Sequence, residues 1–130
     1  MNLNQVTLPA TNVERSVAFY RLLGFRQIVN NLPSYARFEC PDGGTTFSLY
    51  EVPAPVVPGV IIYFECADLD AMHARLQRSG VEFDSPPTDR SWLWREAYLH
   101  DPDGNLLCLY HAGSTRRFPP SRIQSPDDSA

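Results

Sequence analysis

The sequence predicts an α+β domain built from two tandem βαβββ modules, whose curved and mostly antiparallel sheets surround a cavity. One helix-like apolar stretch runs from Asn12 to Gly24, and a second runs from Asp68 to Gly80 at the same offset. The turns at residues 41–44 (PDGG) and 102–105 (PDGN) each lead into an alternating segment. One module alone is too small to bury much apolar surface, so we expect the two modules to pack together or against a second chain.

The first module is predicted to span residues 1–52. Residues 5–8 form its first strand, and Asn12 caps the helix because its side-chain oxygen accepts from the backbone of the next turn. Gly24 ends that helix, and residues 25–29, 35–39 and 45–51 supply three further strands. The apolar side of the helix consists of Val13, Val17, Tyr20 and Leu23.

A proline-rich linker at residues 53–59 separates this module from the second, at residues 60–112. Residues 60–65 are predicted to form a strand, followed by a helix capped by Asp68, with Ala71, Met72 and Leu76 buried and His73 facing solvent. Residues 81–83, 92–100 and 106–111 are the remaining predicted strands. The tail, residues 113–130, is rich in Ser, Pro, Arg and Asp, and we expect it to be partly disordered.

The composition excludes several classes of function. The net charge of -4 argues against nucleic acid as a partner, because phosphates would be repelled. Residues 60–64 form the longest apolar run, far short of the roughly 20 residues that span a membrane. Cys40, Cys66 and Cys108 are odd in number and widely spaced, which favours reduced thiols in a cytoplasmic protein.

Two motifs resemble the vicinal oxygen chelate superfamily, which includes glyoxalase I, extradiol dioxygenases, fosfomycin-resistance enzymes and bleomycin-binding proteins. Residues 12–20 (NVERSVAFY) with residues 23–25 (LGF) resemble its first helix, and residues 101–105 (DPDGN) resemble its closing turn. The resemblance covers residues 3–112. It implies the fold, whereas the reaction varies among members.

The resemblance also implies a divalent metal held by one residue from the first and last strand of each module. The corresponding positions here are Gln5, Ser48, Ile61 and Cys108. Isoleucine cannot coordinate a metal, and a thiolate is a soft ligand where the family uses hard ones. We therefore expect a degenerate metal site and no cofactor; a divalent metal, with Glu51 as a substitute ligand, is the alternative.

Alternation from these four positions predicts which side chains line the cavity. They are Gln5, Thr7, Tyr35, Arg37, Glu39, Ser48 and Tyr50 in the first module, and Ile61, Tyr63, Glu65, Trp94, Glu96, Tyr98, Cys108 and Tyr110 in the second; Thr46, His100 and Leu106 share the alternation. Tyr98 corresponds to a substrate-contacting tyrosine of the fosfomycin-resistance enzymes. Arg37 is expected to pair with a cavity glutamate, His100 with Asp101, and Cys108 is a candidate nucleophile.

Three functions remain open. The favoured one is a glyoxalase- or bleomycin-resistance-like protein that sequesters a small, partly aromatic or cationic ligand, which glutamates and aromatic rings suit. A metal-dependent lyase, isomerase or dioxygenase with a remodelled site is the second. The third is a metal-free enzyme whose catalytic acid or base is Glu39, Glu65, Glu96 or His100. A homodimer is expected, with modules paired either within a chain or across two chains.

Overall fold

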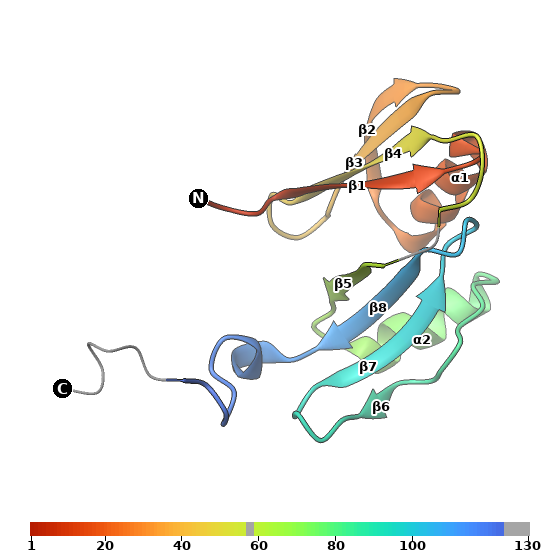
Figure 1. The fold of residues 1–130 in the computed structure, drawn as a ribbon. Helices are drawn as coiled ribbons and strands as arrows, with labels where there is room; N and C mark the ends of the chain where they lie inside the picture. Colours follow the sequence, from red (N-terminus) through yellow and green to blue (C-terminus); the bar gives the residue numbers. More distant parts are fainter. Residues whose placement is uncertain (57–58, 124–130) are drawn as a thin grey trace.

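The computed structural model describes residues 1–56 and 59–123, and it contains two four-stranded sheets, each with one α-helix (Figure 1). The first module contains β1 (Gln5–Ala10), α1 (Val13–Leu23), β2 (Arg26–Asn31), β3 (Tyr35–Glu39) and β4 (Thr46–Glu51). Its sheet order is β1-β4-β3-β2, in which only β1 and β4 run parallel.

The second module repeats this arrangement with the order β5-β8-β7-β6. It contains β5 (Ile61–Glu65), α2 (Leu69–Arg78), β6 (Thr88–Asp89), β7 (Arg95–His100) and β8 (Leu106–His111), followed by the short 3-10 helix η1 (Gly113–Arg116). The predicted α+β fold with two βαβββ modules is confirmed. The disorder expected in the tail falls mainly on residues 124–130, which lie outside the described residues.

The helix ends follow the predicted signals. The side chains of Asn12 and Asp68 accept from the backbone N–H groups of Arg15 and Ala71, each at 3.0 Å. Gly24 ends α1 with φ at +106°, a conformation that glycine adopts without strain.

One predicted strand is wrong and another begins later than predicted. Residues 81–83 are not a strand, because the N–H of Val81 donates to the carbonyl of Leu76 and completes the end of α2. The strand predicted from Trp92 begins only at Arg95, since the N–H of Leu93 donates to the carbonyl of Arg90 and forms a turn. Leu93 takes a φ of +69° in that turn.

His73 also departs from prediction, because it does not face solvent freely. Its ring lies against Phe83 with centroids 4.4 Å apart, and its Nε2 atom is buried without a partner among the described residues. The periodicity of α2 did not reveal this contact, since Phe83 belongs to the irregular segment that follows the helix.

One hydrophobic core joins the two modules. Phe47 of β4 lies at its centre, with ring centroids 5.0 Å from Tyr20 and 5.7 Å from Phe64 of β5. The buried cluster around them continues into both helices and into Leu107 and Leu109 of β8. The modules therefore pack through the sides of the sheets that carry the helices. No helix in the described residues is long and apolar enough to cross a membrane.

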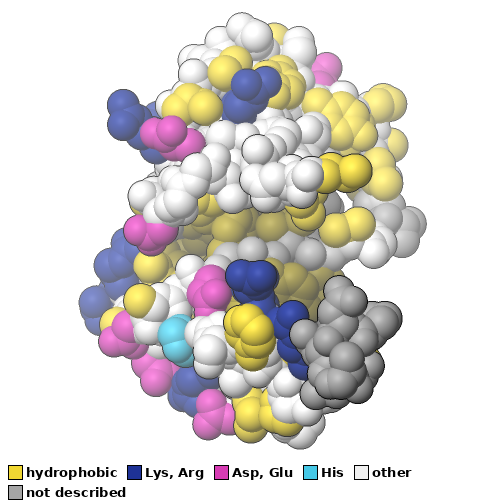
Figure 2. All heavy atoms as spheres, turned by 90° about the vertical axis from the view of Figure 1, so that its left-hand side faces the viewer, with side chains coloured by type: hydrophobic (Ala, Val, Ile, Leu, Met, Phe, Trp, Pro, Cys, Tyr) yellow, Lys and Arg dark blue, Asp and Glu magenta, His cyan; other side chains and the backbone are white. Residues whose placement is uncertain are grey.

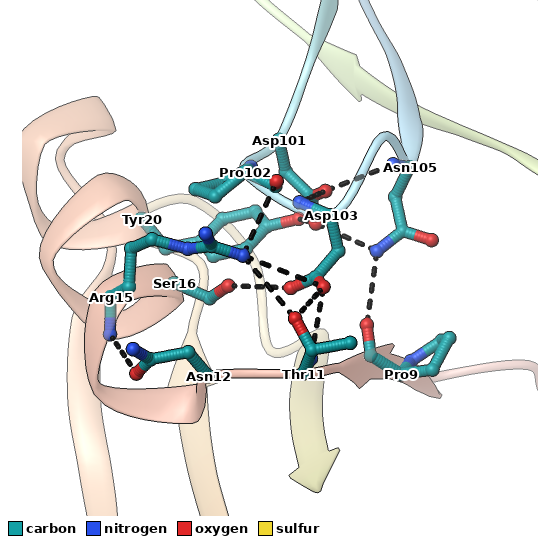
Figure 3. Close-up of polar contacts among 10 residues, drawn as sticks. All are labelled: Pro9, Thr11, Asn12, Arg15, Ser16, Tyr20, Asp101, Pro102, Asp103 and Asn105. Atoms are coloured by element: carbon teal, nitrogen blue, oxygen red, sulfur yellow. Dashed lines mark hydrogen bonds and ion pairs between the residues drawn. The ribbon is translucent and has the colours of Figure 1, made fainter. Parts of the chain in front are cut away.

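A polar junction next to this core joins the β7–β8 turn to α1 (Figure 3). The buried Tyr20 hydroxyl donates to Asp101 at 2.7 Å, and the Asn105 side chain donates to the carbonyl of Pro9. Asp103 accepts from the backbone N–H of Thr11 at 2.9 Å. Burial alone would raise the pKa of Asp103, but its hydrogen bonds to Thr11 outweigh burial and hold that pKa below its ordinary value.

Candidate functional site

The face of the first sheet opposite the shared core carries a connected polar network, which we call the polar face: Gln5, Tyr35, Arg37, Thr46 and Ser48. Gln5 Nε2 donates to Ser48 Oγ at 2.8 Å, and its Oε1 accepts from the hydroxyl of Thr46. The hydroxyls of Tyr35 and Ser48 are 2.6 Å apart. Each residue reaches this face because side chains alternate along β1, β3 and β4.

In the second sheet, the face that points away from the shared core is mostly aromatic. We call it the aromatic face, and it consists of Tyr63, Trp94, Tyr98, Cys108 and Tyr110. Trp94 and Tyr110 stack with centroids 4.8 Å apart, while Tyr63 meets both of them edge-on. Its residues form a cluster separate from the shared core. The side chain of Tyr63 remains 42% exposed, so the cluster has apolar surface left for a ligand or partner.

Neither face covers the other within one chain. Across residues 1–56 and 59–123, no hydrogen bond, ion pair or ring contact joins a polar-face residue to an aromatic-face residue. Tyr50 and Ile61, two further predicted cavity residues, are also exposed. Figure 2 shows the surface hollowed between the upper and lower halves, with hydrophobic side chains lining the hollow. Thr7 lies beside Gln5, within 3.4 Å of its amide nitrogen.

The three predicted cavity glutamates are all engaged by other groups. Glu39 pairs with Arg26 of the neighbouring strand at 3.6 Å. Glu65 accepts from the backbone N–H groups of Ala112 and Gly113 at 2.7 and 2.9 Å, at the start of η1. These two carboxylates therefore already have partners near the edges of their sheets.

Glu96 is the third, and it is only 1% exposed. Its carboxylate accepts from Arg90 Nε at 3.3 Å, from the Trp92 indole N–H at 3.2 Å and from the Tyr98 hydroxyl at 3.1 Å. The sequence alone did not identify Arg90 and Trp92 as partners of this residue. The signal that could have found them is Glu96 itself, since a carboxylate on an enclosed face requires nearby donors.

Arg37 does not pair with a glutamate, contrary to the prediction. Its Nε donates to the Tyr35 hydroxyl at 3.0 Å, and its guanidinium lies 5.6 Å from the centre of the Tyr35 ring. In the described part of the chain, no carboxylate lies within ion-pair distance of it. Hydrogen bonds to Ser48 and Arg37 outweigh burial and lower the pKa of Tyr35.

His100 does not pair with Asp101. Its Nδ1 lies 2.5 Å from Asp84 Oδ2, because Asp101 is occupied by Tyr20 and Asn105. His100 borders a cavity of about 280 Å³ whose other lining residues include Phe19, Leu22 and Pro102. None of that lining belongs to the polar or the aromatic face.

The side chains at the four family metal positions do not fit a resident metal. Both polar atoms of Gln5 are taken by hydrogen bonds, and Ile61 offers only hydrocarbon. Cys108 is fully buried, and burial raises the pKa of its thiol to about 12, so it stays protonated. No group of three or more His, Cys, Asp or Glu residues within the described ranges is placed to hold a metal. Glu51 is exposed and adds no such group.

The buried Cys108 thiol gives a testable expectation. In native protein at pH 8, iodoacetamide should label the half-exposed Cys40 first and leave Cys108 unmodified, because only an accessible thiolate reacts and burial both hides Cys108 and raises its pKa further than that of Cys40. Peptide mass spectrometry after timed labelling measures this, and a urea-unfolded sample shows that all three thiols can react. Rapid native labelling of Cys108 would contradict this expectation and restore it as a candidate nucleophile.

Comparisons with known proteins agree with this geometry. Residues 2–109 match the model of the Glyoxalase/Bleomycin resistance protein/Dioxygenase superfamily. An uncharacterized protein, YraH, from Bacillus subtilis (strain 168) is 30% identical over 127 residues, covering 85% of this chain and 98% of that protein. A trivalent organoarsenical cleaving enzyme from Bacillus sp. (strain MD1) is 31% identical over 122 residues, covering 88% of this chain and 76% of the enzyme.

Solved structures give the same fold. A glyoxalase/bleomycin resistance protein/dioxygenase from Nocardioides has a TM-score of 0.75 at 26% identity, covering 95% of this chain and 90% of that one. A bleomycin-binding protein complexed with bleomycin has a TM-score of 0.71 at 22% identity, covering 85% and 98% of the two chains. At that identity the second likeness concerns the fold alone.

Proposed function

Since this chain belongs to the Glyoxalase/Bleomycin resistance protein/Dioxygenase superfamily, we propose that it binds a small aromatic molecule without a resident metal. The binding cavity forms between the polar face of one copy and the aromatic face of a second. The observation that carries this proposal is the aromatic face itself, where Tyr63, Trp94 and Tyr110 form a cluster outside the core. Rings placed there offer flat apolar walls, and their polar tips orient a ligand.

The packing of the modules supports a second copy as the cover. Each sheet uses its helix-carrying side in the shared core, which leaves its outer face available to a second molecule or a ligand. Covering Tyr50, Ile61 and Tyr63 would remove apolar surface from water, which is favourable by about 25 cal/mol per Å². A symmetric pair of chains would then contain two equivalent cavities. The three free cysteines support a reducing, cytoplasmic setting for this dimer.

The chemistry of the faces supports binding over the two enzymatic alternatives. A metal-dependent lyase, isomerase or dioxygenase needs hard ligands, whereas Ile61 offers only hydrocarbon and the buried Cys108 could offer only a soft thiolate. A metal-free enzyme would need a free general base, whereas Glu39, Glu65 and Glu96 are each held by donors of their own.

Two measurements test the proposal. Light scattering coupled to size exclusion should give the mass of two chains, and a panel of small aromatic compounds should include members that raise the melting temperature. A ligand at 100 times its Kd stabilises by about 2.7 kcal/mol. Trp94→Ala should abolish the shift, while Phe118→Ala, at an exposed tail residue, should preserve it. A monomer that no aromatic compound stabilises would contradict the proposal.

A further inference from the structure

The charges that surround the proposed cavity identify the class of ligand more narrowly. We propose that the ligand is an aromatic oxyanion, carrying a carboxylate or phosphate that Arg37 binds. This inference rests on the proposed function, because it describes the same cavity. The proposed anion takes the place of the cationic ligand that the glutamates in the sequence suggested.

The pairing of the charged groups on the two faces favours an anion. Each of the three carboxylates predicted to line the cavity already has donors: Glu39 has Arg26, Glu65 has two backbone N–H groups and Glu96 has Arg90. Arg37 has no such compensation in residues 1–56 or 59–123, where every ion pair involves other arginines or a histidine. Arg37 therefore keeps terminal nitrogens free for an anion, whereas the oxygens of the three glutamates already accept hydrogen bonds or an ion pair; the backbone N–H groups satisfy Glu65 without cancelling its charge.

The geometry of Arg37 suits an oxyanion. Its Nε is held by the Tyr35 hydroxyl at 3.0 Å, which fixes the guanidinium while leaving Nη1 and Nη2 without a hydrogen bond to the described residues. A planar guanidinium with two free terminal nitrogens matches the two oxygens of a carboxylate or phosphate. Because Arg37 is partly buried and held in place, binding an anion would cost it little conformational freedom.

The groups that neighbour Arg37 also support an anion. The polar face around it consists of the hydroxyls of Tyr35, Thr46 and Ser48 and the amide of Gln5, and the carboxylate that shares this alternation, Glu39, pairs with Arg26 instead. The Tyr35 hydroxyl can add a donor to a bound oxyanion when the buried Ser48 hydroxyl donates to the Tyr35 oxygen, since hydroxyl groups rotate to suit their partners. An aromatic ring attached to that anion would lie against Trp94 and Tyr110 of the second copy's aromatic face.

Three naphthalene compounds with the same ring and different charge test this inference by calorimetry: 2-naphthoate, 2-naphthamide and 2-naphthylmethylammonium. The wild-type protein should bind the anion at least about tenfold more tightly than the cation, as expected for a charge-assisted bidentate contact. Arg37→Gln should lose about that factor for the anion and leave the neutral amide within about threefold. Adding 1-naphthyl phosphate shows whether carboxylate or phosphate binds better.

Two further variants distinguish the loss of the Arg37 contact from a change in net charge or a loss of folding. Arg21→Gln changes the net charge by the same amount on exposed α1, away from both faces, and should bind all three compounds as the wild type does. Arg37→Lys keeps the charge but removes the planar fork, and should give intermediate affinity for the anion. Melting temperatures of all variants show whether each is folded.

The outcomes are distinguishable. Binding of the cation equal to or tighter than the anion, or an Arg37→Gln variant that keeps its affinity for the anion, overturns this inference and leaves the proposed function standing. Failure of every naphthalene compound together with the wider aromatic panel overturns both.

Discussion

Replacing Phe47 with alanine is expected to lower the free energy of unfolding by about 3–5 kcal/mol, a large fraction of the stability of a small domain. Phe47 is 2% exposed and contacts rings from both modules, with Phe38 at 5.1 Å and Phe64 at 5.7 Å. Its removal leaves a cavity at the centre of the shared core. The melting temperature should fall by roughly 10–20 °C, measured by calorimetry or circular dichroism.

The shape of the unfolding transition is as informative as its midpoint. Because one core joins both modules, the variant should still unfold in a single transition. Phe118→Ala serves as the control, since that ring is exposed in the tail and its removal should change the melting temperature by less than about 2 °C. Two separate transitions in the Phe47 variant would show that the modules are independent, contrary to the packing.

The substitution Asp101→Ala is expected to cost about 3 kcal/mol, although it removes no apolar contact. It leaves the fully buried Tyr20 hydroxyl without an acceptor and frees the turn N–H groups of Asp103 and Asn105. A buried donor without a partner has given up its hydrogen bonds to water without replacement, so its full desolvation penalty destabilises the folded state. Urea unfolding measures the change, and the slope m should stay the same.

The repeat supplies a matched control for this junction. Asp42 lies in the corresponding turn of the first module, at the position that matches Asp103, and it is exposed, so Asp42→Ala should change stability by less than about 0.5 kcal/mol. Combining Asp101→Ala with Tyr20→Phe should cost less than the sum of the two single changes, because the phenylalanine removes the orphaned donor. Additive costs would show that the Tyr20–Asp101 bond contributes nothing specific.

Local signals in the sequence were sufficient for most of the fold. Asn12, Gly24 and Asp68 act within one turn of the backbone, and their predicted caps are present. The segment after α2 could not be predicted in the same way. Val81 and Phe83 alternate like a strand, but Val81 completes the helix end and the N–H of Asp84 donates to the carbonyl of Tyr98. Alternation alone cannot distinguish a strand from an extended segment that packs irregularly.

For the site, alternation indicated which side chains share a face but not how their charges pair. Glu39 lies beside Arg26 only because β2 and β3 are in a particular register, and Arg90 reaches Glu96 through a turn that was predicted as a strand. Both partners depend on geometry between strands that composition does not reveal. The sequence suggested a cationic ligand because the glutamates were visible in it, whereas their pairing with Arg26 and Arg90 was not.

The polar junction at the β7–β8 turn has a consequence for how the two halves diverged after duplication. Asp103 meets Thr11 and Ser16 at the start of α1, whereas the corresponding positions before and within α2 are Ala67 and Met72, which cannot donate a side-chain hydrogen bond to an acidic turn. A chimera that joined two copies of residues 60–112 would place each acidic turn beside Ala67 and Met72. At this turn the second half is therefore a specific complement of the first, and a second copy of residues 60–112 would not supply the same hydrogen bonds.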